Sequence, residues 1–155
     1  METFKFSLNR VRNYKSQVLD KEKKVLGALQ RQRNDMLERI DALEHFRAQK
    51  ATEIAEKQKK GATMNELMQY DFLIENARGQ IMAAREELKK LEAAVEAQRQ
   101  VVLSIYQEKT GMDKLEEKQA EEYRVLEAKA TENEIMQVIS NKLAGGGDDS
   151  EAGIA

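Results

Sequence analysis

The sequence predicts an all-α protein, a long two-helix antiparallel coiled-coil hairpin followed by a disordered C-terminal tail. Three observations favour this fold class. The 155 residues include no proline, so long helices can run without interruption. Only 5% of the residues are aromatic while 35% are charged, which leaves too little bulky apolar material for a layered core. Apolar residues also recur at alternating spacings of three and four, which is typical of helices that pack along a seam.

The first predicted helix covers residues of about 4–59. Its seam is expected at alternating spacings from position 8 to position 46, and Leu19, Leu26, Leu37 and Ile40 each fall one place later and widen the stripe. A strand would instead alternate in twos, so the pattern predicts an amphipathic helix. The apolar seam positions are Leu8, Val11, Val18, Val25, Leu29, Met36, Leu43 and Phe46.

A single turn is predicted at residues of about 60–63. Basic residues precede Gly61, as is typical of a helix C-terminus, where cations face exposed carbonyl groups and glycine adopts a left-handed cap. Thr63 and Glu66 have the spacing of a capping box, which marks the start of a second helix. A turn this short requires the two helices to be antiparallel neighbours.

The second predicted helix covers residues of about 64–142. With the turn at Gly61, residue i is expected to face residue number ~122 − i, so the stretch after Leu115 should lack a partner within the chain. The hairpin domain is therefore residues 1–143, and the glycine- and acid-rich residues 144–155 are expected to be disordered. The seam residues are Leu67, Tyr70, Ile74, Ala77, Ile81, Ala84, Leu88, Leu91, Val95, Gln98, Val102 and Ile105.

Charge is divided between the two halves of the chain. Residues 1–60 hold 15 basic and 9 acidic side chains, whereas residues 61–140 hold 10 basic and 16 acidic ones. Opposite balances attract, so the halves are expected to pair within one molecule. Two other interpretations stay open: a homodimer of extended helices, and a basic first helix that binds duplex DNA. The apolar seam through that basic helix argues against DNA binding, because its face is committed to packing.

Residues for catalysis are scarce. The chain has no cysteine and a single histidine, His45, which stands beside seam positions without convergent metal ligands. No glycine-rich phosphate loop follows a strand, and two helices provide no concave pocket. The sequence therefore predicts a non-enzymatic protein without cofactor or metal. The start of the chain has no apolar signal segment, which makes the cytoplasm the expected compartment.

Three segments stand out by their order and spacing. The opening segment is Phe4-Lys5-Phe6-Ser7-Leu8 with Val11 and Tyr14-Lys15; the middle one is Gly61-Ala62-Thr63 with Leu67, Tyr70, Phe72-Leu73 and Ile81; the late one is Leu115-Glu116, Tyr123 and Asn133-Glu134-Ile135. Together these segments resemble the flagellar export protein FliJ family, over residues of about 4–136. Asn133 stands where the family usually has aspartate, so a salt bridge of that acid is not expected here.

The resemblance implies a coiled-coil stalk and adaptor of flagellar type III protein export. It implies binding to the hexameric export ATPase (FliI-like), the export gate protein (FlhA-like) and export chaperones. From the residues themselves, neither nucleic-acid binding nor membrane insertion is expected. The expected location is the cytoplasm, peripheral to the inner membrane at the flagellar base. The resemblance maps ATPase contacts onto Phe4, Phe6, Arg10, Leu115, Tyr123 and Leu126, and gate contacts onto Tyr70, Phe72, Leu73, Asn76 and Ala77.

These candidate contacts compete with ordinary packing roles. Tyr70 and Ala77 lie on the seam and are expected in the core, whereas Phe72, Leu73 and Asn76 lie off it and favour a partner. Phe4 and Phe6 either cap the hairpin or enter the ATPase, and both roles stay open. Tyr123 and Leu126 are expected to have no intrachain partner. The alternative function is a structural or chaperone-escort coiled coil without ATPase coupling.

Overall fold

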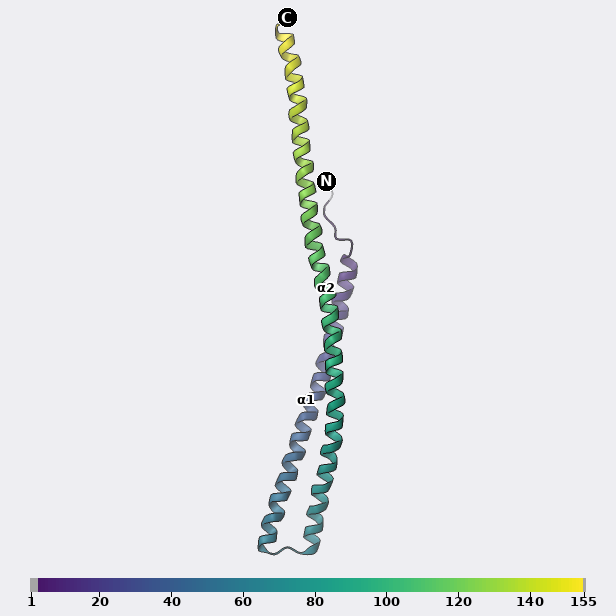
Figure 1. Ribbon diagram of the computed structural model, residues 1–155, viewed down its shortest axis with the longest axis vertical. Helices are drawn as coiled ribbons and strands as arrows, with labels where there is room; N and C mark the ends of the chain where they lie inside the picture. The colour runs from purple at the N-terminus through teal and green to yellow at the C-terminus, as the bar shows by residue number, and fades with distance from the viewer. Residues whose placement is uncertain (1–2, 155) are drawn as a thin grey trace. The chain divides into compact units, whose positions relative to one another are not determined.

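The computed structural model describes residues 3–154, with side chains for residues 3–145. It contains two α-helices, α1 (Asn9–Lys60) and α2 (Met64–Ile154), and no strand within that described range (Figure 1). The all-α, two-helix fold class predicted from the sequence is confirmed. Two compact units divide the chain: unit 1 comprises Met1–Lys15 with Gln107–Ala155, and unit 2 comprises Ser16–Tyr106.

Unit 2 is an antiparallel helical hairpin, in which the α1 and α2 segments lie side by side and join at residues 61–63 (Figure 1). Its core is thin and built largely from small or branched side chains. Alanine at such positions allows the two backbones to approach closely, and each larger side chain packs against the opposite helix. The buried residues of unit 2 are Leu19, Ala77, Ile81, Ala84 and Val95, each at most 6% exposed.

The seam of α2 in unit 2 agrees with the predicted one at all twelve positions, which are buried or half-buried. Even Gln98, the polar member, is satisfied: its Nε2 donates to the backbone oxygen of Glu22 at 3.1 Å and to Glu22 Oε2 at 2.5 Å. A polar pair in an apolar seam favours one register over its neighbours.

The predicted seam of α1 was wrong at five of its twelve positions, 11, 25, 32, 39 and 46, which are exposed. Val11, Val25 and Phe46 are 42%, 40% and 37% exposed, and the side chains facing α2 stand one residue later. Leucine and isoleucine at the later positions bury more apolar surface than valine, and arginine stems cover the seam while their charged ends reach water. The buried or half-buried positions of α1 that follow this spacing in unit 2 are 19, 22, 26, 29, 33, 36, 40, 43, 47, 50 and 54. Positions 16, 18, 27, 28, 30, 44 and 53 beside them are also half-buried.

Polar contacts between the helices give the register. Within unit 2, the residue numbers of contacting pairs add to 120 for Glu22 with Gln98, 123 for Glu53 with Tyr70 and 129 for Glu44 with Arg85. Within unit 1, Lys15 and Glu108 add to 123. These values lie near the sum of about 122 that follows from a turn at Gly61.

The turn has the cap chemistry that its sequence predicts. Gly61 has φ = 95°, a left-handed conformation that side chains rarely adopt, and its N–H donates to the Gln58 carbonyl at 3.4 Å. Thr63 then caps α2, because its Oγ1 accepts the Glu66 N–H at 3.2 Å and its carbonyl accepts the Leu67 N–H at 3.1 Å. Lys57, Lys59 and Lys60 place positive charge in the last turn of α1.

Alanine at Gly61 and alanine at Gly79 are expected to change stability in opposite directions. Neither added Cβ meets an atom within 4 Å, so backbone conformation alone decides the outcome. Gly61→Ala should lower the free energy of unfolding by about 1 kcal/mol, because its φ is positive. Gly79→Ala, inside α2, should raise it by about 1 kcal/mol through helix propensity. Urea unfolding followed by circular dichroism checks both signs, and a shift in the same direction for both variants would contradict this account.

Helix α1 begins at Asn9, later than the predicted start near residue 4. In a helix Phe4 and Phe6 would point about 200° apart, so only one of them would face α2. The non-helical segment lets both rings turn inward, and it closes with the Asn9 N–H donating to the Phe6 carbonyl at 3.2 Å. The predicted disorder of residues 144–155 stays a prediction, because the side chains of 146–155 and all of residue 155 lie outside the described residues.

Candidate interaction surfaces

The N-terminal segment of residues 3–8, which we call the strap, packs on α2 within unit 1. Its side chains alternate: Phe6 is buried and Phe4 half-buried, whereas Lys5 and Ser7 are exposed. The Phe4 and Tyr123 rings lie 5.7 Å apart between centroids and are tilted by 45°, a favourable geometry for an aromatic pair. The strap therefore contacts α2 through one face, by means of two aromatic rings.

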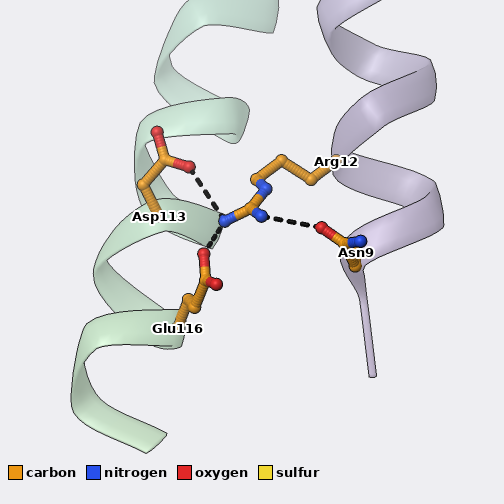
Figure 2. A network of polar contacts seen from close by, with 4 residues as sticks. All are labelled: Asn9, Arg12, Asp113 and Glu116. Carbon is orange, nitrogen blue, oxygen red and sulfur yellow. Dashed lines mark hydrogen bonds and ion pairs between the residues drawn. The ribbon is translucent and has the colours of Figure 1, made fainter. Parts of the chain in front are cut away.

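Arg12 links the start of α1 to α2 within unit 1 (Figure 2). Its guanidinium reaches from α1 to Asp113 (3.4 Å) and Glu116, and it also donates to Asn9 Oδ1 at 2.7 Å. The same guanidinium carbon lies 5.3 Å from the centroid of the Phe6 ring, within cation–π range. One turn later along α1, Lys15 Nζ lies 2.5 Å from Glu108 Oε2. Basic α1 groups thus meet acidic α2 groups in unit 1, as the charge division predicts.

The structure brings together part of the predicted ATPase-contact set. Phe4 and Tyr123 contact each other, so the expectation that Tyr123 lacks an intrachain partner was wrong. The strap is not helical, so the helical register that predicted an end of pairing near Leu115 does not apply to it. Arg10 is exposed, and Leu126 is 59% exposed.

A second exposed apolar surface in unit 1 lies on α2 beyond Tyr123. Sequence reasoning missed most of it, although Val125, Ala128, Ile135 and Ile139 keep coiled-coil spacing on a different face from the seam. Ala128, Ile135 and Met136 line a shallow hollow together with charged neighbours. The large exposed side chains of this stretch are Val125, Leu126, Ile135, Met136, Val138, Ile139 and Leu143.

In unit 2 a shallow apolar hollow of about 430 Å³ lies on α2 close to the turn. Met68, Gln69, Phe72 and Leu73 line it, and Phe72 and Met68 are 68% and 64% exposed. Met64 precedes them on the same face at a spacing of four and is also exposed. The exposure of Phe72 agrees with its off-seam position. The sequence analysis missed Met64 and Met68, although their spacing of four residues with Phe72 could have indicated this surface.

We call Met64, Met68, Phe72 and Leu73 the methionine face.

The other predicted gate residues divide between core and surface. Ala77 is 3% exposed and belongs to the core of unit 2, as its seam position predicts, whereas Asn76 is exposed. Tyr70 is half-buried: Lys57 Nζ lies 5.2 Å from its ring centroid, and its hydroxyl donates to Glu53 Oε2 at 3.1 Å. Tyr70 therefore serves the pairing of the two helices.

Hydrogen bonds from Lys50 Nζ and then from the Tyr70 hydroxyl lower the pKa of Glu53 below its ordinary value, because both stabilise the carboxylate. Tyr70→Phe should raise this pKa, since one of the two donors is lost. A lowered folded-state pKa contributes stability above the unfolded-state pKa, and this contribution disappears as the pH falls through the folded-state value. The loss of folding stability at acid pH that comes from protonation of Glu53 should therefore be smaller in Tyr70→Phe. Carboxyl NMR titration measures the pKa directly, and an unchanged value would contradict the assignment.

The remaining candidates for chemistry do not gather into a site. His45 is exposed on α1. In the part of the chain that the structure describes, no three His, Asp or Glu side chains are grouped to hold a metal ion. Over the same residues, neither helix combines the length and apolar character that crossing a membrane requires.

Comparison with known proteins identifies the family. The family model for the flagellar FliJ protein matches residues 4–135, which include the strap, the turn, the methionine face and the Tyr123 region. No curated protein and no solved structure matches the sequence. The match covers most of the chain, with the bounds that the resemblance gives to within one residue. The chain therefore belongs to the flagellar FliJ protein family, whose members serve in flagellar protein export.

Proposed function

We propose that this protein is a non-enzymatic stalk and adaptor of flagellar type III export. In this proposal unit 1 binds the export ATPase hexamer (FliI-like), and the methionine face of unit 2 binds the export gate protein (FlhA-like). One observation carries this proposal. The chain belongs to the FliJ family, and it has exposed apolar side chains both in unit 1, at Leu126, and on the methionine face of unit 2, at Met68 and Phe72. The protein would act at the cytoplasmic face of the inner membrane, at the flagellar base.

The continuity of α2 supports a coupling role. Helix α2 runs from Met64 to Ile154 without proline and carries both candidate surfaces. Binding of one such helix to a ring of identical subunits is asymmetric, and it can favour hexamer closure through differential affinity for the closed ring. The same helix would then link ATP turnover to the gate. Methionine side chains adapt to differently shaped partners, which also suits contacts with several export chaperones.

Addition of this protein to the purified export ATPase is expected to increase hexamer formation and ATP turnover. Leu126→Asp should reduce this stimulation about tenfold, because a charge placed on an exposed apolar contact disfavours its burial. Leu103→Asp is the matched control, since Leu103 is also exposed on α2 but lies in unit 2. Unchanged hexamer formation and turnover with the unmodified protein would contradict ATPase coupling and favour the escort function.

Gate binding is tested separately on the methionine face. Simultaneous substitution Met68→Ala and Phe72→Ala is expected to weaken binding to the purified gate domain about tenfold, because both are exposed anchors of one hollow. Met82→Ala is the control, as Met82 is 69% exposed on α2 but lies outside this hollow. Isothermal titration calorimetry measures the affinities. Equal affinities for the double variant and the unmodified protein would exclude this face from the gate contact.

A further inference from the structure

The strap is held by side chains rather than by secondary structure. Residues 3–6 adopt no regular element and residues 7–8 form a turn, and the Asn9 N–H to Phe6 carbonyl bond joins the strap to α1. Phe4 and Phe6 face inward while Thr3, Lys5 and Ser7 are exposed. A segment with few backbone hydrogen bonds and few buried contacts belongs to the part of a protein that opens most readily.

A few side-chain contacts hold the strap against α2, and some of them are electrostatic. Phe4 rests against Tyr123, and Phe6 lies against the guanidinium of Arg12. Arg12 is in turn held by Asp113 and Glu116, whose side chains are 50% and 35% exposed. Because these carboxylates face solvent, salt should weaken their hold on Arg12 and thereby on the strap.

Three of the residues to which the resemblance maps ATPase contacts belong to the strap or touch it, whereas Leu126 stays exposed. Phe4, Phe6 and Tyr123 are committed to contacts within unit 1, so they are not all available to a partner at the same time. We propose that the strap is an autoinhibitory latch: when closed it pairs Phe4 with Tyr123, and it must release before the export ATPase binds this part of α2. This inference rests on the proposed function for its partner, whereas the opening of the latch is a property of the protein alone.

The natural sequence lacks cysteine, which allows the latch to be measured without background labelling. Spin labels at Thr3→Cys and Glu122→Cys, both exposed positions beside the Phe4–Tyr123 pair, report the distance between strap and α2. The full-length protein should show a major short distance. Adding Asp113→Asn and Glu116→Gln should raise the long-distance fraction about threefold, the size expected for loss of exposed ion pairs, and added salt should act in the same direction. Glu92→Gln and Glu96→Gln, acidic changes within unit 2, are the control and should leave the distances unchanged.

A reducible bismaleimide between the same two cysteines tests the consequence for binding. The cross-linked protein should bind the export ATPase at least about tenfold more weakly than the same sample after reductive cleavage of the linker. Equal binding before and after cleavage would overturn the latch. If neither sample binds, the proposed ATPase contact fails, and the spin-label distances then decide the latch: a long-distance fraction that increases with Asp113→Asn and Glu116→Gln supports it, and an unchanged distribution overturns it.

Discussion

Replacement of Ile81 by aspartate is expected to unfold the hairpin of unit 2 at ordinary temperatures. Ile81 is 4% exposed and lies on the α2 seam between Ala77 and Ala84, which are 3% and 5% exposed. A carboxylate at this position would lose its hydration without gaining a partner, which costs about 4 kcal/mol. The thin core offers little to offset this loss, since total stabilities of small domains are about 5–15 kcal/mol. Urea unfolding followed by circular dichroism measures the change.

The neighbouring residue provides the control for this substitution. Met82 is 69% exposed, so Met82→Asp introduces the same carboxylate into the same helix turn without burying it. Its effect on the free energy of unfolding should stay within about 0.5 kcal/mol. Similar destabilisation by both variants would mean that the loss comes from helix propensity, and that the Ile81 side chain does not contribute to a core.

The sequence was sufficient for the α2 seam and for the turn. From Leu67 to Ile105 one stripe of buriable residues recurs at coiled-coil spacing, whereas the apolar series of Met64, Met68 and Phe72 beside it does not continue past Phe72. Gly61 and Thr63 supply the left-handed cap and the helix start, each by a local mechanism that does not depend on distant contacts. Features specified by neighbouring residues in this way are readable from one sequence.

The α1 seam was less readable because two adjacent stripes compete. Val18 and Leu19, and likewise Val25 and Leu26, are apolar neighbours, so the period alone does not show which member faces the partner. Packing against α2 selects Leu19, which is 3% exposed, and leaves Val25 40% exposed. Which of two adjacent residues is buried depends on the shape of the opposite helix, and the periodicity of one helix alone does not show it.

The candidate surfaces were predictable in part. The off-seam position of Phe72 correctly indicated an exposed aromatic side chain near the turn, but Met64 and Met68 were missed because methionine counts as ordinary core material. The contact of Phe4 with Tyr123 joins residues 119 positions apart through a segment that is not helical. The register of two paired helices ends the contact between them near Leu115, and it does not describe a segment that is not helical. For this reason Tyr123 was expected to have no partner within the chain.

Phe6→Ala is expected to open the strap and the first turns of α1 while leaving unit 2 intact. Phe6 is 8% exposed, the one buried side chain among the described residues of unit 1, and its ring also receives the Arg12 guanidinium. Truncation of a buried phenylalanine costs about 3 kcal/mol, which corresponds to amide exchange on the order of a hundredfold faster where protection arises from this packing. Hydrogen-exchange mass spectrometry of peptides from residues 3–15 and 107–123 measures the effect, with peptides from unit 2 as internal reference.

Tyr14→Ala separates this packing effect from the loss of any aromatic ring near the N-terminus. Tyr14 lies in the same unit and on the same helix as Arg12, but its side chain is 66% exposed, so its removal leaves no cavity. Exchange in residues 3–15 should therefore remain within about twofold of the unmodified protein, since exposed substitutions change stability by less than about 0.5 kcal/mol. If both variants accelerated exchange equally, the aromatic content of α1 rather than the buried position of Phe6 would be responsible. Acceleration by Phe6→Ala alone would locate the stability of unit 1 in the contact between the strap and α2.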